Sequence, residues 1–269
     1  MYTNFYNLKE IPFNITSDPS FFFGSSIHEE AFSNILYGIL ARKGIVVMTG
    51  EIGTGKTTLC RALLNRLDQQ VKTAFIFNPC FSDVQLLQLI LRDLGIANHK
   101  TSDKLELIES LNAFLLEQSS QGNNVAIIID EAQNLDVHQL EQIRLLSNLE
   151  TEKHKLLQIL LVGQPELFDK LKLPELRQLN QRVSVRYHIT PLLTEDVKNY
   201  IQHRLKTAGS LSKIHFTEEA FEAVYRHSKG VPRLINVICD RALLAGFVKD
   251  TFIIDDAIIH QAAREVTTT

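Results

Sequence analysis

The segment 50–57, with the sequence GEIGTGKT, constrains this chain more than any other feature. It directly follows an aliphatic run at 44–49 and leads into a helical pattern at 56–70. It matches GxxxxGK[ST], in which glycines adopt positive φ and let backbone N–H groups approach phosphate oxygens. A strand that leads through such a loop into a helix also directs the positive end of the helix at an anion. The segment therefore predicts a nucleotide-binding loop.

The loop residues have distinct expected roles. Lys56 supplies a positive charge to the β- and γ-phosphates, and the Thr57 hydroxyl is an expected ligand of Mg²⁺. We expect the phosphate cradle to consist of Gly50, Glu51, Ile52, Gly53, Thr54, Gly55, Lys56, Thr57 and Thr58.

A second aliphatic run, at 125–130, ends in the carboxylates Asp130 and Glu131. We expect Asp130 to hold Mg²⁺ alongside Thr57, and Glu131 to orient and deprotonate an attacking water. The structural alternative is a strand followed by a polar turn. A carboxylate pair beside a γ-phosphate favours hydrolysis over binding alone. It also disfavours a small-molecule kinase, because no acceptor site is recognisable in the sequence.

Short aliphatic runs alternate with helical patterns up to residue 190. The other expected strands are 73–78, 156–162 and 183–189, and the other expected helices are 82–94, 103–118 and 137–149. Uniformly aliphatic strands separated by helices predict a parallel sheet covered on both faces. The fold class is therefore α/β.

The strand pattern stops at Pro191 and helical patterns follow it. The expected helices are 194–208, 217–228, 231–248 and 255–264. We therefore expect three parts: an N-terminal segment at 1–44, an α/β nucleotide-binding core at 45–190, and a small all-helical lid at 191–269.

Charge and cysteine content narrow the function classes. The net charge is −3, and the part from Pro191 on carries 10 basic and 10 acidic residues. Bulk electrostatics therefore give no support to binding of nucleic acid or an anionic membrane. Cys60, Cys80 and Cys239 show no metal or disulfide spacing, which favours a reducing cytosol. No signal peptide is visible, and the apolar runs are too short to span a membrane. These features predict a soluble intracellular protein.

Motifs spread over nearly the whole chain resemble the AAA+ ATPases of the ExeA/GspA type, which serve bacterial secretion, pilus assembly and exosortase-linked export. The matching segments are 5–8 (FYNL), 12–13 (PF), 18–19 (DP), 22–25 (FFGS), 28–31 (HEEA), 49–57 (TGEIGTGKT), 130–133 (DEAQ), 162–167 (VGQPEL) and 230–236 (GVPRLIN). The resemblance implies a RecA-like P-loop core, a helical lid, and ATP with Mg²⁺ as cofactors.

The resemblance also assigns roles to polar residues outside the loop. Gln164 matches the sensor-1 position; the alternative is that it only precedes a helix. Arg233 matches sensor 2, which reaches the phosphates from the lid; the alternative is a surface arginine at a helix start. Arg182 resembles an arginine finger that acts in a neighbouring subunit. Arg177 and Arg186 are rival fingers, and a solvated basic stretch is the structural alternative.

Adenine recognition is expected from the segment before the loop and from the lid. The candidates are Phe23, His28, Tyr200 and Ile201. The same aromatic and aliphatic side chains are equally suited to an ordinary core, and this alternative stays open.

The resemblance implies an ATP-driven motor or switch that works as a homo-oligomer, with Arg182 acting in trans. It further implies a secretion or pilus-assembly protein as partner, and a cytoplasmic location that leaves room for peripheral attachment to the inner membrane through partners. Secretion members typically continue into a transmembrane segment and a peptidoglycan-binding domain. Neither follows here, so we expect a stand-alone member or a fragment.

Two other functions compete with the motor. One is a DNA-directed ATPase like the transposition regulators of the TniB/TnsC kind, which share the loop, the acidic strand end and the lid. Its weakness is the lack of a basic stripe interleaved with aromatics. A DNA-dependent ATPase rate that falls steeply with salt would favour it. The other is a binding-only switch, which Glu131 and Arg182 argue against.

Overall fold

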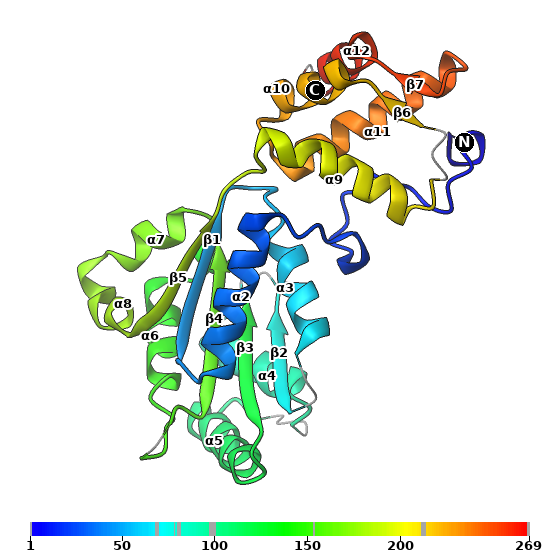
Figure 1. The fold of residues 1–269 in the computed structure, drawn as a ribbon. Helices are drawn as coiled ribbons and strands as arrows, with labels where there is room; N and C mark the ends of the chain where they lie inside the picture. The colour runs from blue at the N-terminus through cyan, green and yellow to red at the C-terminus, as the bar shows by residue number, and fades with distance from the viewer. Residues whose placement is uncertain are drawn as a thin grey trace. The chain divides into compact units, whose positions relative to one another are not determined.

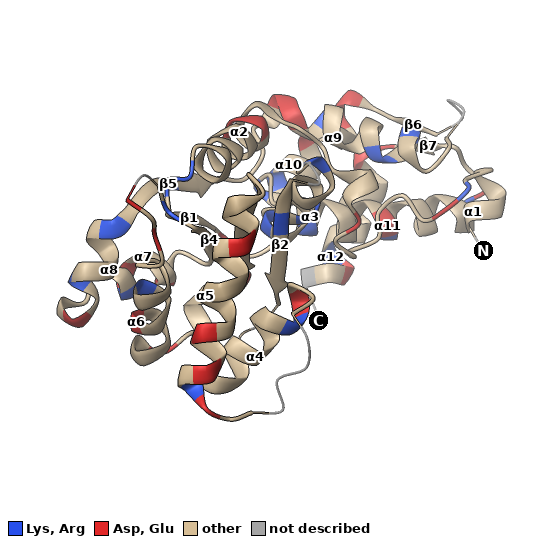
Figure 2. Ribbon diagram, turned by 90° about the horizontal axis from the view of Figure 1, so that it is seen from below, with Lys and Arg blue, Asp and Glu red and all other residues tan. Residues whose placement is uncertain are grey.

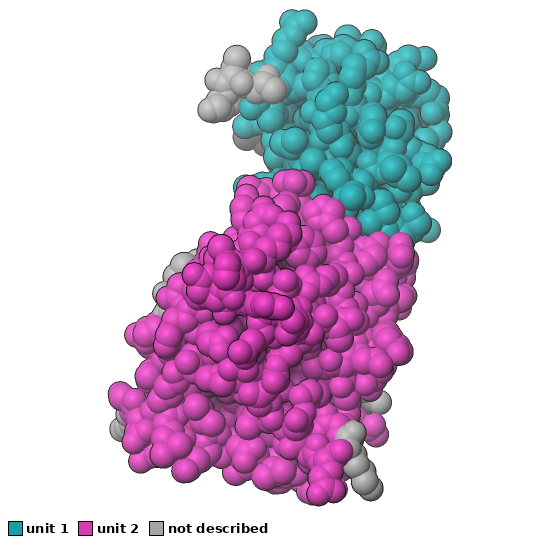
Figure 3. Space-filling view, turned by 90° about the vertical axis from the view of Figure 1, so that its left-hand side faces the viewer, with its two compact units in different colours: residues 1–28, 53–61, 190–269 teal, residues 29–52, 62–189 magenta. Residues whose placement is uncertain are grey.

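The computed structural model describes residues 2–67, 70–77, 79, 82–96, 101–152, 154–210 and 214–267. The chain forms two compact units (Figure 3). Unit 1 consists of residues 1–28, 53–61 and 190–269, and unit 2 of residues 29–52 and 62–189. The three-part division at 44/45 and 190/191 stays a prediction.

Unit 2 is built on a parallel sheet with the strand order β2-β3-β4-β1-β5 (Figure 1). All four strand pairings in it are parallel. Every residue of β1, β3 and β4 is buried, as expected for central strands covered on both faces. The predicted α/β class is confirmed. The strands are β1 (Ile45–Gly50), β2 (Val71–Ile76), β3 (Asn124–Ile129), β4 (Leu157–Gly163) and β5 (Val183–Ile189).

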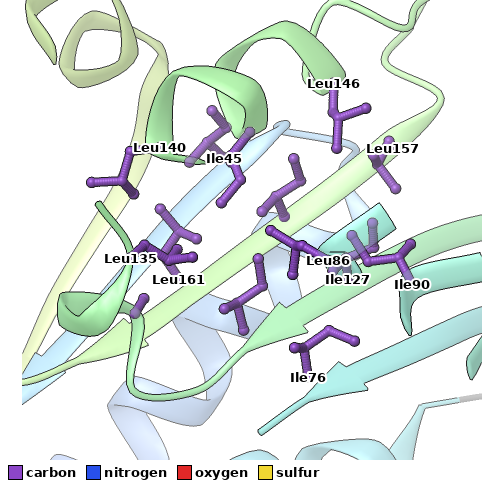
Figure 4. Packing of buried hydrophobic residues seen from close by; sticks show 14 of the residues in the cluster. Ile45, Ile76, Leu86, Ile90, Ile127, Leu135, Leu140, Leu146, Leu157 and Leu161 are labelled. Atoms are coloured by element: carbon purple, nitrogen blue, oxygen red, sulfur yellow. The ribbon is translucent and has the colours of Figure 1, made fainter. Parts of the chain in front are cut away.

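Helices cover both faces of this sheet. On one face, α2 approaches β1 closely, because a Cβ on Gly38 would lie 2.6 Å from Val46 Cγ2. The opposite face packs against the helices that follow β2, β3 and β4, and Figure 4 shows part of this aliphatic core. The helices are α2 (Ser26–Leu40), α3 (Lys56–Arg66), α4 (Asp83–Asp93), α5 (Lys104–Ser120), α6 (Val137–Leu146), α7 (Glu166–Leu171) and α8 (Arg177–Arg182), with the 3₁₀ turns η2 (Ala132–Asn134) and η3 (Pro174–Leu176).

Unit 1 is mainly helical and has its own core. It contains α9 (Thr194–Thr207), α10 (Glu218–Ser228), α11 (Pro232–Val248) and α12 (Asp256–Thr267), together with the N-terminal α1 (Tyr2–Phe5) and η1 (Pro19–Phe21). The expectation that no strand follows Pro191 is wrong: β6 (His215–Phe216) pairs in parallel with β7 (Ile253–Ile254). Two residues per strand are too few for a periodic pattern to be recognised.

The N-terminal segment is part of the unit 1 core. Arg204 on α9 is buried and donates hydrogen bonds to the carbonyl oxygens of Pro12 (2.6 Å) and Asn14 (2.9 Å). Its guanidinium carbon lies 4.6 Å from the centre of the Phe21 ring. Tyr6, also buried, donates to the carbonyl oxygen of Leu243 on α11. These contacts tie residues 6–21 to the C-terminal helices.

Some predicted bounds differ from those observed. The helix predicted at 56–70 ends at Arg66, and the one predicted at 137–149 ends at Leu146. The helices α2 and α8 were not predicted, and α7 was expected only under the alternative that Gln164 precedes a helix. Both α7 and α8 are only six residues long. Asn78, the predicted last residue of the second strand, and Cys80 lie outside the described residues.

Candidate functional site

Polar residues gather where three neighbouring strands of unit 2 end. β1 ends at Gly50, β3 at Ile129 and β4 at Gly163, and the three strands run in the same direction in register. Because the carboxyl ends of parallel strands share one edge, Asp130 and Gln164 emerge at the same edge as the start of the glycine-rich loop. Ligand sites of open α/β sheets lie at this edge.

Asp130 is fully buried at the end of β3. Its backbone N–H donates to the carbonyl oxygen of Ile76 (2.9 Å), and its Oδ1 accepts the N–H of Glu131 (3.0 Å). The carboxylate position is therefore fixed by the strand and by the turn that follows it. Carboxylate oxygens are ligands that Mg²⁺ prefers, so Asp130 is a suitable donor for this ion.

Glu131 has a left-handed backbone conformation, with φ 55° and ψ 38°. This region is uncommon for a residue other than glycine and is found preferentially at functional sites. The carboxylate Oε2 accepts hydrogen bonds from Gln133 Nε2 (2.6 Å) and from Gln164 Nε2 (3.4 Å). The side chain predicted as base and the side chain predicted as sensor 1 are therefore in contact. Gln164 also lies two residues before α7, so it does precede a helix as well.

Residues 53–57 of the glycine-rich loop, which belong to unit 1, show the backbone geometry that the motif requires. Gly53 has φ 82° and Gly55 has φ 96°, which only glycine adopts without strain. The loop carbonyl of Thr54 lies 2.9 Å from His28 Nε2, and Ser25 Oγ lies 2.7 Å from His28 Nδ1. A carbonyl only accepts, so Nε2 carries the proton and Nδ1 accepts from the hydroxyl. His28, expected near the adenine, supports the loop backbone here.

Arg233 lies at the first turn of α11 and against the same loop. Its backbone N–H donates to the carbonyl oxygen of Gly53 (3.2 Å). A Cβ on Gly53 would lie 2.7 Å from Arg233 Cβ and 3.2 Å from Val231 Cγ1. Gly230, with φ 76°, lies just before this segment and packs closely on Leu192, because a Cβ there would lie 2.0 Å from the carbonyl oxygen of Leu192. The segment predicted as sensor 2 therefore packs on the predicted phosphate loop.

Arg182 lies at the other edge of the sheet. It precedes Val183, which pairs with Ile45 at the amino end of β1. Its guanidinium donates to Asn148 Oδ1 and contacts Ser147 Oγ at 3.5 Å.

The two rival arginines lie close by in the sequence. Arg186 Nη2 donates to the carbonyl oxygen and to Oδ1 of Asn180 (2.7 and 2.6 Å), so it holds α8 to β5. Arg177 begins α8.

The lid residues expected near adenine are buried in the unit 1 core. Ile201 is fully buried, and the Tyr200 hydroxyl donates to Asn236 Oδ1 (2.9 Å). Burial raises the pKa of Tyr200 in spite of its hydrogen bond from Arg204. Phe23 packs against Tyr200 and against His203, with ring centres 5.8 and 5.6 Å apart. Burial and the neighbouring Arg204 lower the pKa of His203.

Two comparisons show which known proteins this chain is similar to. Residues 40–171 match the family described as AAA domain. General secretion pathway protein A of Aeromonas hydrophila is 43% identical over 267 residues, which are 99% of this chain and 49% of that protein. These matches confirm the resemblance to the ExeA/GspA-type AAA proteins. The chain spans about half the length of this relative.

Several solved structures have folds similar to that of this chain. Cdc6p from Pyrobaculum aerophilum matches with a TM-score of 0.68 and 18% identity, covering 93% of this chain and 71% of that one. The Aeropyrum pernix ORC2 protein matches with a TM-score of 0.67 and 16% identity, covering 88% and 66%. The Thermotoga maritima RuvB branch migration motor matches with a TM-score of 0.56 and 17% identity, covering 90% and 69%. At these identities the likeness concerns the fold alone.

Charged side chains of both signs are distributed over the described helices, and Figure 2 shows acidic and basic residues interspersed along them. Among the described residues, no group of three or more His, Cys, Asp or Glu side chains is placed to hold a metal ion. In the same part of the chain, no helix is both long and apolar enough to cross a membrane.

Sequence reasoning missed two residues of the site. Gln133 is part of the matching segment 130–133 without a role of its own, and Lys170 belongs to the basic stretch that was the structural alternative for Arg182. Lys170 Nζ donates to the carbonyl oxygens of Gln133 (2.6 Å) and Leu135 (2.7 Å). A helical lysine five residues after Pro165 carries no local signal of this role, because its partners are more than 30 residues away.

Proposed function

We propose that this chain is an ATP hydrolase whose reaction cycle drives or switches the assembly of a bacterial secretion, pilus or exopolysaccharide-export system. The match to the AAA domain and the similarity to general secretion pathway protein A support a secretion-related AAA protein. ATP hydrolysis is supported above all by one contact. The Glu131 carboxylate contacts Gln164 directly beside Asp130, at the carboxyl edge of the sheet.

Each residue of the proposed site has its own role in ATP hydrolysis. The backbone N–H groups of the loop and Lys56 bind the phosphates, and Thr57 and Asp130 would hold Mg²⁺, which neutralises phosphate charge when bound. Glu131 accepts a proton from the attacking water, and Gln164 orients the water or the γ-phosphate. Arg233 would contribute its charge from the first turn of α11, where a cation is unfavourable unless an anion is its partner.

The proposed active form is a homo-oligomer. Within unit 2, Arg182 lies at the amino edge of the sheet, whereas Glu131 lies at the carboxyl edge. Arg182 is therefore badly placed to reach a phosphate bound beside the carboxylates of its own chain. We expect it to contact the phosphate bound by a neighbouring chain. An arginine finger supplied by a neighbouring chain raises the rate of hydrolysis by about 10³- to 10⁵-fold. The partner would be a secretion or pilus-assembly protein, which would bring the oligomer to the inner membrane.

Phosphate release from Mg-ATP, measured against protein concentration, tests the hydrolase. We expect turnover per chain to rise with concentration and to fall by about 10²- to 10⁴-fold in Glu131→Gln. Equilibrium titration should show unchanged ATP affinity in that variant. The exposed Glu109→Gln on α5 serves as the matched control. Turnover equal to the unmodified chain in Glu131→Gln, or no phosphate release at any concentration, would contradict the proposal.

A further inference from the structure

Gln133 joins two parts of the candidate site through a single side-chain amide. Its Oε1 accepts the backbone N–H of Gln164 (3.0 Å), and its Nε2 donates to Glu131 Oε2 (2.6 Å). The residue thus connects the segment after β4 to the carboxylate after β3.

The chemistry of the partners determines the direction of this amide. A backbone N–H only donates, so it must face the amide oxygen of Gln133. An ionised carboxylate only accepts, so it must face the amide nitrogen. A flipped amide would lose both hydrogen bonds at once. The two contacts therefore fix each other, and the Glu131 carboxylate is held in one direction.

Neighbouring residues are arranged to admit and hold this side chain. A Cβ on Gly163 would lie 2.8 Å from Gln133 Oε1 and 3.3 Å from the Gln133 backbone nitrogen, so a larger residue there would displace the amide. The Lys170 ammonium donates to the carbonyl oxygens of Gln133 and Leu135 and so anchors the turn from the side of α7. Both features help to fix the position of Gln133 in addition to its two amide hydrogen bonds.

We propose that Gln133 is a positioning residue that aims the Glu131 carboxylate and couples its direction to the backbone of Gln164. A displacement of the segment after β4, such as a γ-phosphate would cause by drawing in the Gln164 side chain, moves the amide and with it the base. The proposal rests on the proposed hydrolase, because it acts through Glu131. Gln133 itself touches neither water nor phosphate in this role.

Gln133→Met tests the role, because it keeps the length of the side chain and removes both hydrogen bonds. We expect kcat to fall by about ten- to a hundredfold, the usual effect of removing a partner that orients a functional ligand. ATP affinity should stay unchanged, which also shows that the variant is folded. Gln202→Met, at an exposed position of α9, is the matched control. A kcat within twofold of the unmodified chain would overturn the proposal.

A double variant separates this inference from the proposed function. If Gln133 acts through Glu131, Gln133→Met should cause no further loss of turnover in a Glu131→Gln background. An additional loss equal to that of the single variant would overturn the inference while leaving Glu131 as base. Unchanged turnover in Glu131→Gln alone would instead contradict the proposed function.

Discussion

The backbone N–H of Arg233 donates a hydrogen bond to the carbonyl oxygen of Gly53 in the glycine-rich loop. These residues are 180 positions apart in the sequence, yet a Cβ on Gly53 would lie 2.7 Å from Arg233 Cβ. The predicted phosphate loop and the predicted sensor arginine therefore share one packing surface in unit 1. A change of loop conformation on nucleotide binding would act directly on the start of α11.

The first prediction concerns Gly53→Ala. Alanine at φ 82° costs about 1–2 kcal/mol of backbone strain, and its Cβ would also displace Arg233. We expect lower stability in urea denaturation and at least tenfold weaker ATP binding.

Gly122→Ala is the matched control for this change. Gly122 has φ 80° and nothing within 4 Å of the added Cβ. The Gly122→Ala change therefore measures the backbone strain alone, without a steric clash. It should lose similar stability and keep full ATP affinity. Equal ATP affinity in the two variants would show that the close packing of Gly53 against Arg233 does not matter for ATP binding.

The second prediction concerns Arg204, whose guanidinium binds the carbonyl oxygens of Pro12 and Asn14. Arg204→Met leaves the buried carbonyl of Pro12 without this donor. We expect the free energy of unfolding to fall by about 2–3 kcal/mol, with faster proteolysis before residue 25. Arg241→Met, exposed on α11, should change neither. A protease-resistant N-terminal segment in Arg204→Met would show that the aromatic packing alone holds it.

The third prediction is a pH dependence that arises from His203. Burial and Arg204 lower its pKa in the folded protein below the ordinary value of 6.5, and Nε2 is buried without a hydrogen-bond partner among the described residues. The unfolded chain therefore binds the proton first as the pH falls. Stability should decrease as the pH drops through 6.5 and level off below the folded pKa.

Urea denaturation between pH 8 and pH 5 measures this effect. His203→Phe keeps the ring against Phe23 and removes the titration, so its stability should depend less on pH over this range. An identical pH dependence in the variant and the unmodified chain would assign the effect to other groups.

The parts of the molecule that the sequence predicted are those with a local cause. β1, β3 and β4 are buried over their whole length, so their aliphatic runs are continuous and recognisable. The Asp130–Glu131 pair and the loop glycines follow these runs directly.

What the sequence did not predict depends on contacts between distant segments. The Gln133 amide meets Gln164 across 31 positions, and His28 meets the Thr54 carbonyl across 26. The left-handed backbone of Glu131 has no signal of its own, because only the surrounding turn imposes it. β6 and β7 are too short for any pattern.

The last prediction tests whether Arg182 acts on a neighbouring chain. Lys56→Ala removes the phosphate contact and Arg182→Ala removes the finger, so each variant alone should hydrolyse ATP slowly. In a mixed oligomer, a site with an intact loop from an Arg182→Ala chain can receive an intact arginine from a Lys56→Ala neighbour. For random mixing in equal amounts, about one quarter of the interfaces are then complete, and turnover should recover to about that fraction. Arg177→Ala and Arg186→Ala, mixed with Lys56→Ala in the same way, distinguish the rival arginines. If turnover fails to recover at every ratio although mixed oligomers are confirmed by sizing, Arg182 does not act in trans.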